Sequence, residues 1–235
     1  MNSTKQDVLR QCSFGERIAE EEIRELSSYF VQTDQWQKIY SGEIDIIYGS
    51  KGSGKSAIYG VLLGKSDELF ERSILVKAAE NPRGTPAFKD LVNDPPSSEE
   101  EFRALWKVYL LSLTGAVFKE YGIKNAHSKK LVAALQSADL LPADTDLSGY
   151  IRVALDFVRH LLKPESMEAG VNLDPVLQTP VGFTGKISLR APSADEKRAG
   201  FSSIDELFKT ANEALEEEDF ELWLVLDRLD VAGSG

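Results

Sequence analysis

The residues with the clearest chemistry form one run, Gly49-Ser50-Lys51-Gly52-Ser53-Gly54-Lys55-Ser56. The run fits the spacing G-x-x-x-x-G-K-S/T, whose glycines let the backbone turn tightly and approach an anion closely. Its N–H groups would point inward at the start of a helix, where the helix dipole favours negative charge. Lys55 would then bind the β- and γ-phosphate oxygens of a nucleotide, and Ser56 would be a ligand of Mg²⁺. Lys51 stands at a variable position, where it either adds positive potential or is an ordinary surface lysine.

A second candidate group lies near the end of the chain, where the apolar run 222–226 is followed by Asp227. An apolar strand ending in Asp is the Walker B pattern, whose carboxylate holds Mg²⁺, often through water. An Asp can also end a strand for structural reasons alone. Its occurrence together with a phosphate loop favours the metal-binding interpretation.

The elements expected around these motifs place both of them at strand ends. The β-branched run 43–48 predicts a buried strand directly before the phosphate loop, and 55–63 predicts a helix directly after it. Residues 73–78 predict another strand. The near-continuous apolar run 220–226 is typical of a middle strand in a parallel sheet.

Apolar residues at helical spacing predict the remaining helices, at about 16–31, 98–122, 128–138, 147–162 and 203–215. Two of these helices begin with the capping-box pairs Ser98 with Glu101 and Ser203 with Glu206. Alternation of apolar and polar residues over 181–189 predicts one strand of an antiparallel β-hairpin.

We therefore expect an α/β fold, a P-loop NTPase three-layer sandwich with a mainly parallel sheet, a helical insertion and a β-hairpin insertion. The expected parts of this single domain (1–235) are an N-terminal helical segment (14–42), a phosphate-loop half (43–97), the helical insertion (98–163), the hairpin insertion (167–190) and the last helix with the Walker B strand (201–235). Only eight residues follow Asp227, whereas an AAA+-like sheet needs two more strands. We expect the domain to be incomplete at its C-terminal end or completed by another polypeptide, with an exposed sheet edge open to association.

These motifs, with Phe14-Gly15-Glu16 and a helix ending near Tyr29-Phe30-Val31, resemble a group of prokaryotic P-loop ATPases near the AAA+, STAND and KAP ATPases. Several members of that group act in anti-phage defence. The resemblance implies ATP rather than GTP, bound with Mg²⁺, and a switch or motor role in a homo-oligomer or with a partner protein. It also implies that Phe14 and Gly15 lie near the adenine.

The chain departs from this group directly after the Walker B aspartate. Many AAA+ ATPases carry a Glu there that polarises the attacking water, whereas this chain has Arg228. Asp230 is then either the water-activating base or the ion-pair partner of Arg228. Catalysis would rest mainly on electrostatic positioning by Lys55 and Asp227.

Two other functions are compatible with the motifs. Arg228 in place of Glu favours a nucleotide-sensing interaction module that turns over little ATP or none. A small-molecule kinase would need a basic lid, and the best candidate, 190–201, offers only Arg190, Lys197 and Arg198, offset by two acidic residues. We rank the kinase last.

Composition limits the remaining possibilities. The 235 residues include 42% apolar side chains and carry a net charge of −11, which disfavours bulk nucleic-acid binding. Between Asp205 and Asp230 there are ten acidic and two basic residues, for which the simplest interpretation is a solvated helix face. Cys12 is the only cysteine, we find no signal peptide, and the most apolar stretch, 106–118, is too short to cross a bilayer. We therefore expect a cytoplasmic protein without membrane attachment.

Overall fold

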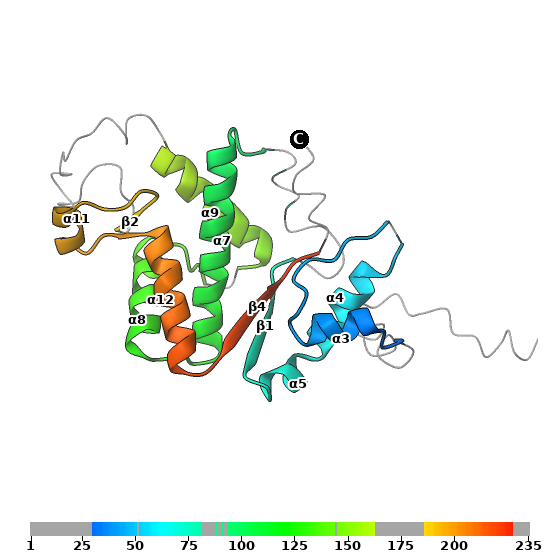
Figure 1. Cartoon of the computed structure of the whole chain (residues 1–235). Coiled ribbons are helices and arrows are strands. Elements are labelled where there is room, and N and C mark those ends of the chain that lie inside the picture. Colours follow the sequence, from blue (N-terminus) through cyan, green and yellow to red (C-terminus); the bar gives the residue numbers. More distant parts are fainter. Residues whose placement is uncertain are drawn as a thin grey trace, which may run out of the picture.

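The structure is a computed structural model that describes residues 30–50, 52–80, 88, 91, 94–143, 145–162 and 186–227. In chain order its elements are α3 (Asp34–Tyr40), α4 (Lys55–Gly64), α5 (Ser66–Phe70), β1 (Ile74–Ala78), α7 (Glu99–Glu120), α8 (Ala126–Ser137), α9 (Leu147–Leu162), β2 (Ile187–Ser188), α11 (Ala194–Arg198), β3 (Ser202–Ser203), α12 (Ile204–Glu217) and β4 (Glu221–Val225) (Figure 1). The strands form two parallel pairs, β1 with β4 and β2 with β3. The described chain is thus a mixed α/β structure.

The central sheet joins two strands that are far apart in the sequence. β1 and β4 run parallel, in a register that pairs Ile74 with Glu221 and Ala78 with Val225. The backbone N–H of Ala79 donates to the Val225 carbonyl at 2.8 Å, which extends the ladder by one residue. The strands predicted at 73–78 and 220–226 are confirmed. β4 is only half-buried, and among the described strands it pairs with β1 alone. The prediction that this run is a middle strand of the sheet is therefore wrong for the described residues.

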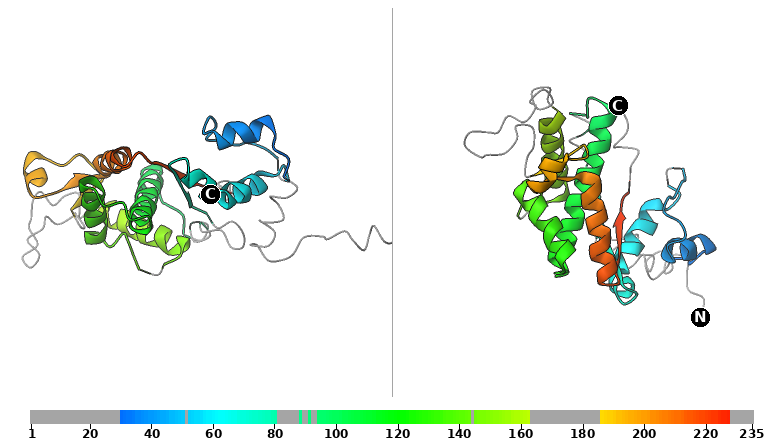
Figure 2. Two further views of the ribbon diagram at one scale, coloured as in Figure 1. Left: turned by 90° about the horizontal axis from the view of Figure 1, so that it is seen from below. Right: turned by 60° about the vertical axis from the view of Figure 1, so that its left-hand side comes forward.

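Helices cover both faces of this sheet (Figures 1 and 2). Alternating residues of the two strands divide between two core clusters, Ile74, Val76, Trp223 and Val225 in one and Leu75, Leu222, Leu224 and Leu226 in the other. The first cluster contains Ile58, Val61 and Leu62 of α4. The second, larger cluster is built mainly from α7, α8, α9 and α12. Helix, sheet and helix therefore follow one another in three layers.

The predicted helices beyond the phosphate loop are confirmed, with small changes at their ends. The middle of α7, residues 108–118, is buried on most sides rather than along one stripe, because α8, α9 and α12 pack against it. The capping box of Ser203 and Glu206 forms in full at the start of α12. At the start of α7, Ser98 accepts from the Glu101 N–H, but the Glu101 carboxylate bonds Ser97 and Arg159 instead of closing the box.

The prediction of a strand at 43–48 is wrong. Residues 44–50 have no regular secondary structure, and the side chains of Ile46 and Tyr48 are 65% and 88% exposed. A β-branched run forms a strand only where a neighbouring strand offers hydrogen-bond partners, and neither β1 nor β4 pairs with this run. The α/β class is therefore observed, but the strand that should lead into the phosphate loop is not.

Other predictions are tested only in part. Of the helix predicted at 16–31, only Phe30 and Val31 are described, and they are not helical. Of the β-hairpin predicted within 167–190, residues 167–185 lie outside the described residues. The described end, β2, pairs in parallel with β3, a partner that the sequence analysis did not predict.

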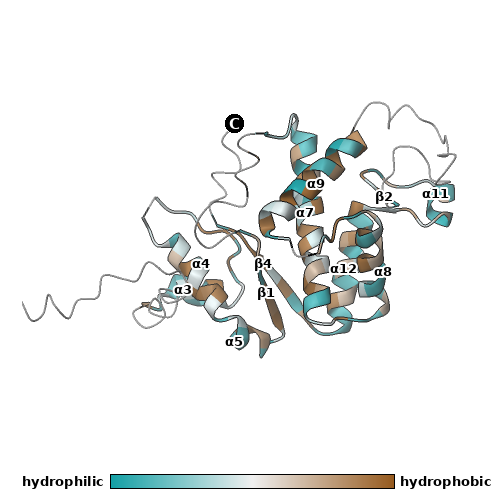
Figure 3. Cartoon of the chain, turned by 180° about the vertical axis from the view of Figure 1, so that it is seen from behind, coloured by the Kyte–Doolittle hydropathy of each residue, from teal (hydrophilic) through white to brown (hydrophobic). Residues whose placement is uncertain are grey.

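The acidic segment is a solvated face, as predicted. The acidic side chains at both ends of α12 and in the turn to β4 are exposed, and Figure 3 shows polar and apolar residues on different sides of this helix. Asp227 is the buried exception, at 8% exposure. None of the helices within the described ranges is long and apolar enough to cross a membrane.

Candidate functional site

The glycines of the phosphate loop adopt the backbone that their residue type allows. Gly52 and Gly54 have φ of 84° and 88°, the left-handed region that side chains with a Cβ rarely adopt. Gly54 is the N-cap of α4, and its carbonyl accepts the Ile58 N–H at 3.0 Å. The predicted helix directly after the loop is confirmed. Its N-terminal N–H groups receive no side-chain cap from Gly54, which is the geometry an anion-binding helix start needs.

Lys55 closes the loop from its far end. Its ammonium group donates to the carbonyls of Gly49 at 2.7 Å and Ser50 at 2.9 Å. A Cβ on Gly49 would lie 2.4 Å from Ser53 Oγ and 3.3 Å from Ser53 Cβ, so a side chain at this position requires Ser53 to move. The structure thus brings Gly49, Ser50, Ser53 and Lys55 together around one small loop, whose glycines and Lys55 ammonium group suit a phosphate chain.

The other predicted residues of the loop are less constrained. Ser56 is exposed in the first turn of α4, where its hydroxyl is accessible to a metal ion. Lys51 lies outside the described residues. Residues 44–50 are not part of a sheet, so no described strand supports the start of the loop. A described contact that holds it is the hydrogen bond from Lys55 of α4 to the Gly49 carbonyl.

Asp227 lies two residues beyond the last residue of β4, and a second carboxylate occupies the equivalent place beyond β1. β1 ends at Ala78, which pairs with Val225, so Glu80 and Asp227 follow the two paired strand ends at the same distance. Both are buried, with Glu80 0% and Asp227 8% exposed. The sequence analysis missed Glu80, because its place beside Asp227 depends on the pairing of two strands that are far apart in the sequence.

Two tyrosines fix the carboxyl end of β1. The Tyr59 hydroxyl donates to the Glu80 carbonyl, and the Tyr109 hydroxyl donates to the Ala79 carbonyl at 2.8 Å. Burial raises the pKa of Tyr109, and the nearby Glu80 and Tyr59 raise it further, so this hydroxyl stays protonated as a donor. Tyr59 follows Lys55 by one helical turn on α4. The strand end that carries Glu80 is therefore tied directly to the phosphate-loop helix.

The connection between Asp227 and the phosphate loop runs through packing. Trp223 and Val225 of β4 share a core cluster with Val61 and Leu62 of α4. Among the remaining predicted site residues, Asp230 lies outside the described residues, as do Arg228 and the segment containing Phe14 and Gly15. Their roles stay predictions.

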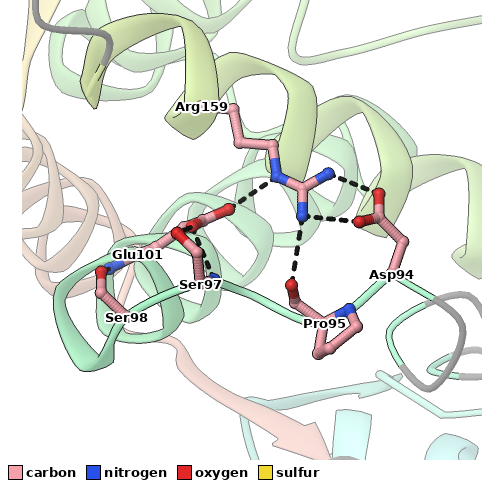
Figure 4. A network of polar contacts seen from close by, with 6 residues as sticks. All are labelled: Asp94, Pro95, Ser97, Ser98, Glu101 and Arg159. Atoms are coloured by element: carbon pink, nitrogen blue, oxygen red, sulfur yellow. Dashed lines mark hydrogen bonds and ion pairs between the residues drawn. The ribbon is translucent and has the colours of Figure 1, made fainter.

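A separate polar network lies at the start of α7 (Figure 4). Arg159 of α9 donates to Glu101 at 2.6 Å, and it donates to both carboxylate oxygens of Asp94, the Oδ1 contact being 3.0 Å. Glu101 is 3% exposed and also accepts the Ser97 N–H at 2.8 Å. Burial raises the pKa of Glu101, but the bonds from Ser97 and Arg159 outweigh burial and hold the pKa below its ordinary value. The network clamps the segment before α7 to α9.

The segment considered as a kinase lid has its basic groups occupied. Arg190 bonds Glu196 at 2.6 Å, Lys197 pairs with Glu206 at 2.9 Å, and Arg198 pairs with Asp195 at 3.2 Å. The Arg190 hydrogen bond is the main cause that lowers the pKa of Glu196 to about 2. These ion pairs hold α11 in place and weigh against a phosphate-binding lid here.

Comparisons with protein-family models, curated proteins and solved structures found no match for this chain.

Proposed function

We propose that the chain binds ATP with Mg²⁺ and hydrolyses it. The observation that carries the proposal is the loop from Gly49 to Ser56, closed by Lys55 at the N-terminus of α4. A parallel strand pair covered by helices on both faces, with Asp227 buried just beyond β4, supports a P-loop NTPase sandwich. The resemblance to prokaryotic P-loop ATPases adds a switch or motor role in a larger, cytoplasmic assembly, such as one for anti-phage defence.

Each residue has a distinct role in this proposal. The loop N–H groups and Lys55 bind the β- and γ-phosphates, and Ser56 with Asp227 holds the metal ion. Mg²⁺, when bound, neutralises charge on the β- and γ-phosphate oxygens. Lys55 must exchange the carbonyls of Gly49 and Ser50 for phosphate oxygens, which gives its ammonium group a charged partner.

A nucleotide-sensing module remains the second candidate, because Arg228 stands where many AAA+ ATPases carry the catalytic Glu. Such a module would bind ATP as described and release little phosphate. The two functions differ in turnover and not in binding.

Phosphate release from ATP tests the proposal. We expect Mg²⁺-dependent turnover by the 235-residue chain that Asp227→Asn lowers about 100-fold or more, since removing one electrostatic group of a site costs about 10²–10³ in kcat. Asp219→Asn, which changes an exposed aspartate before β4, is the matched control and should keep wild-type turnover. Turnover that is independent of Mg²⁺ or unchanged in Asp227→Asn would contradict the proposed metal site.

A further inference from the structure

We propose that Glu80 is the catalytic base that takes the proton of the attacking water, a role that rests on the proposed ATP hydrolysis. The sequence lacks such a group at its usual place. Arg228 occupies the position after the Walker B aspartate, where many AAA+ ATPases carry the Glu that polarises the attacking water. The structure offers a carboxylate from the neighbouring strand instead. This residue was not among those that the sequence analysis selected.

Strand register sets the position of Glu80 beside Asp227. Ala78 pairs with Val225, and the Ala79 N–H to Val225 carbonyl bond carries the pairing one residue further. Glu80 and Asp227 each lie two residues beyond these paired ends. The carboxyl ends of adjacent parallel strands meet at one edge of a sheet, where ligands of α/β proteins bind.

The alternation of side chains within the strands defines the face of the sheet that packs against α4. Ile74 and Val76 of β1 and Trp223 and Val225 of β4 pack in the cluster that contains α4. It is the face covered by the phosphate-loop helix. Residues 79 and 80 form a bend beyond β1, so Glu80 is placed beside Asp227 by the shared edge of the sheet and not by this alternation.

A direct contact connects the end of β1 to the phosphate-loop helix. Tyr59 of α4 donates its hydroxyl hydrogen to the Glu80 carbonyl, and Tyr59 lies one turn after Lys55. The lysine that would bind the γ-phosphate and the backbone of Glu80 are thus joined through a single helical turn. The Tyr109 bond to the Ala79 carbonyl, at 2.8 Å, fixes the same strand end from the opposite layer.

The chemical step conserves atoms and electrons. The water oxygen bonds to the γ-phosphorus while the bond from that phosphorus to the β,γ-bridging oxygen breaks, and its electron pair leaves with ADP. The Glu80 carboxylate accepts the proton that the water loses and returns it to the phosphate product, since Glu80 itself is 0% exposed. General bases of this kind contribute about 10²–10⁴ in rate.

The test compares Glu80→Gln and Glu80→Asp with the wild type in three measurements: ATP affinity with Mg²⁺, phosphate release, and melting temperature. We expect ATP affinity within about threefold of wild type for both variants, while phosphate release falls about 100-fold or more in Glu80→Gln. Glu80→Asp retains a carboxylate and should release phosphate faster than Glu80→Gln. A purely structural Glu80 would give the opposite order, because Gln matches the shape of Glu better than Asp does.

A second buried glutamate provides the control. Glu101→Gln, in the clamp before α7, should lower the melting temperature and leave phosphate release per folded chain unchanged. If Glu80→Gln releases phosphate within threefold of the wild-type rate, the role of Glu80 is overturned. The same follows if Asp230→Asn loses phosphate release while Glu80→Gln keeps it. A wild-type chain that binds ATP and releases no phosphate would also overturn it, and would leave nucleotide binding standing. Absence of ATP binding to the wild type would instead overturn the proposed function itself.

Discussion

The contact between Gly49 and Ser53 shows how closely the phosphate loop is folded on itself. A methyl group on Gly49 would lie 2.4 Å from Ser53 Oγ and 3.3 Å from Ser53 Cβ. The substitution therefore requires the Ser53 hydroxyl to rotate away and Ser53 to shift within the loop, which disturbs the N–H groups that would bind phosphate. At this position a side chain is crowded by Ser53, whereas at Gly52 and Gly54 it is disfavoured by the positive φ.

We therefore expect Gly49→Ala to weaken ATP binding about tenfold or more, while the melting temperature changes little because the loop is exposed. Binding of a fluorescent ATP analogue would measure this effect. Gly122→Ala is the matched control, because Gly122 has φ of 71°, no atom within 4 Å of its would-be Cβ, and a place at the end of α7. It should cost about 1 kcal/mol of stability and leave ATP affinity unchanged. Equal affinities of Gly49→Ala and the wild type would contradict the proposed geometry of the loop.

Single residues differ in how far the sequence could predict them. Gly54, Lys55 and Ser56 were predictable because their spacing itself carries the chemistry, and the structure confirms the helix that follows them. Glu80 was not, because its position beside Asp227 depends on a strand register between segments more than 140 residues apart. A local pattern contains no information on such a register.

At the scale of elements, the clamp of Arg159 on Asp94 and Glu101 connects α9 to the start of α7. The hydrogen bond from Arg159 lowers the pKa of Asp94, and Glu101 has a lowered pKa despite its burial. Carboxyls whose folded-state pKa is depressed stabilise the fold above their unfolded pKa of about 4–4.5. That contribution is lost as the pH falls through their folded-state pKa.

Melting temperature as a function of pH tests this clamp. We expect the wild type to lose stability steeply below about pH 4.5, and Glu101→Gln to lose less over the same range because one of the titrating groups is gone. At pH 7 the variant should be less stable by about 2 kcal/mol, the usual value of hydrogen bonds to a charged group. Glu99→Gln, an exposed neighbour in the first turn of α7, should follow the wild-type curve. Parallel curves for the wild type and Glu101→Gln would show that this carboxylate does not titrate with folding.

Helices whose caps and apolar spacing lie within their own sequence were predicted well. Strands, which need hydrogen bonds from a neighbouring strand, were predicted less well. Capping residues and apolar spacing predicted α7, α9 and α12 to within a few residues. The run 43–48 has the composition of a strand, but strand formation also requires a neighbour with free backbone groups. The short helices α3, α5 and α11 lacked enough turns to produce a periodic signal.

At the scale of the whole molecule, the irregular run before the phosphate loop exposes consecutive apolar side chains. Ile46 is 65%, Ile47 38% and Tyr48 88% exposed. Contiguous exposed apolar residues commonly mark a surface that is covered by another chain. This observation agrees with the expectation that the proposed ATPase works in an assembly.

We expect the chain to associate as its concentration rises, with Ile46→Ser shifting the equilibrium toward the 26.0 kDa monomer. Light scattering coupled to size-exclusion chromatography measures this shift. Val31→Ser removes a similarly exposed apolar group, at 75%, from a different segment and should leave the association unchanged. A wild-type chain that stays monomeric at all concentrations would contradict an association surface at 44–48.

ATP binding to the wild type and to Lys55→Ala, measured by isothermal titration calorimetry, tests the central claim most directly. Lys55 supplies the ammonium group of the phosphate loop, so its removal should weaken ATP binding about 100-fold, as expected for a lost charge-assisted hydrogen bond of about 3 kcal/mol. Lys65→Ala removes a lysine beyond the other end of α4, where it pairs with Glu68, and should bind ATP like the wild type. A wild-type chain that binds ATP no more tightly than Lys55→Ala would contradict the account.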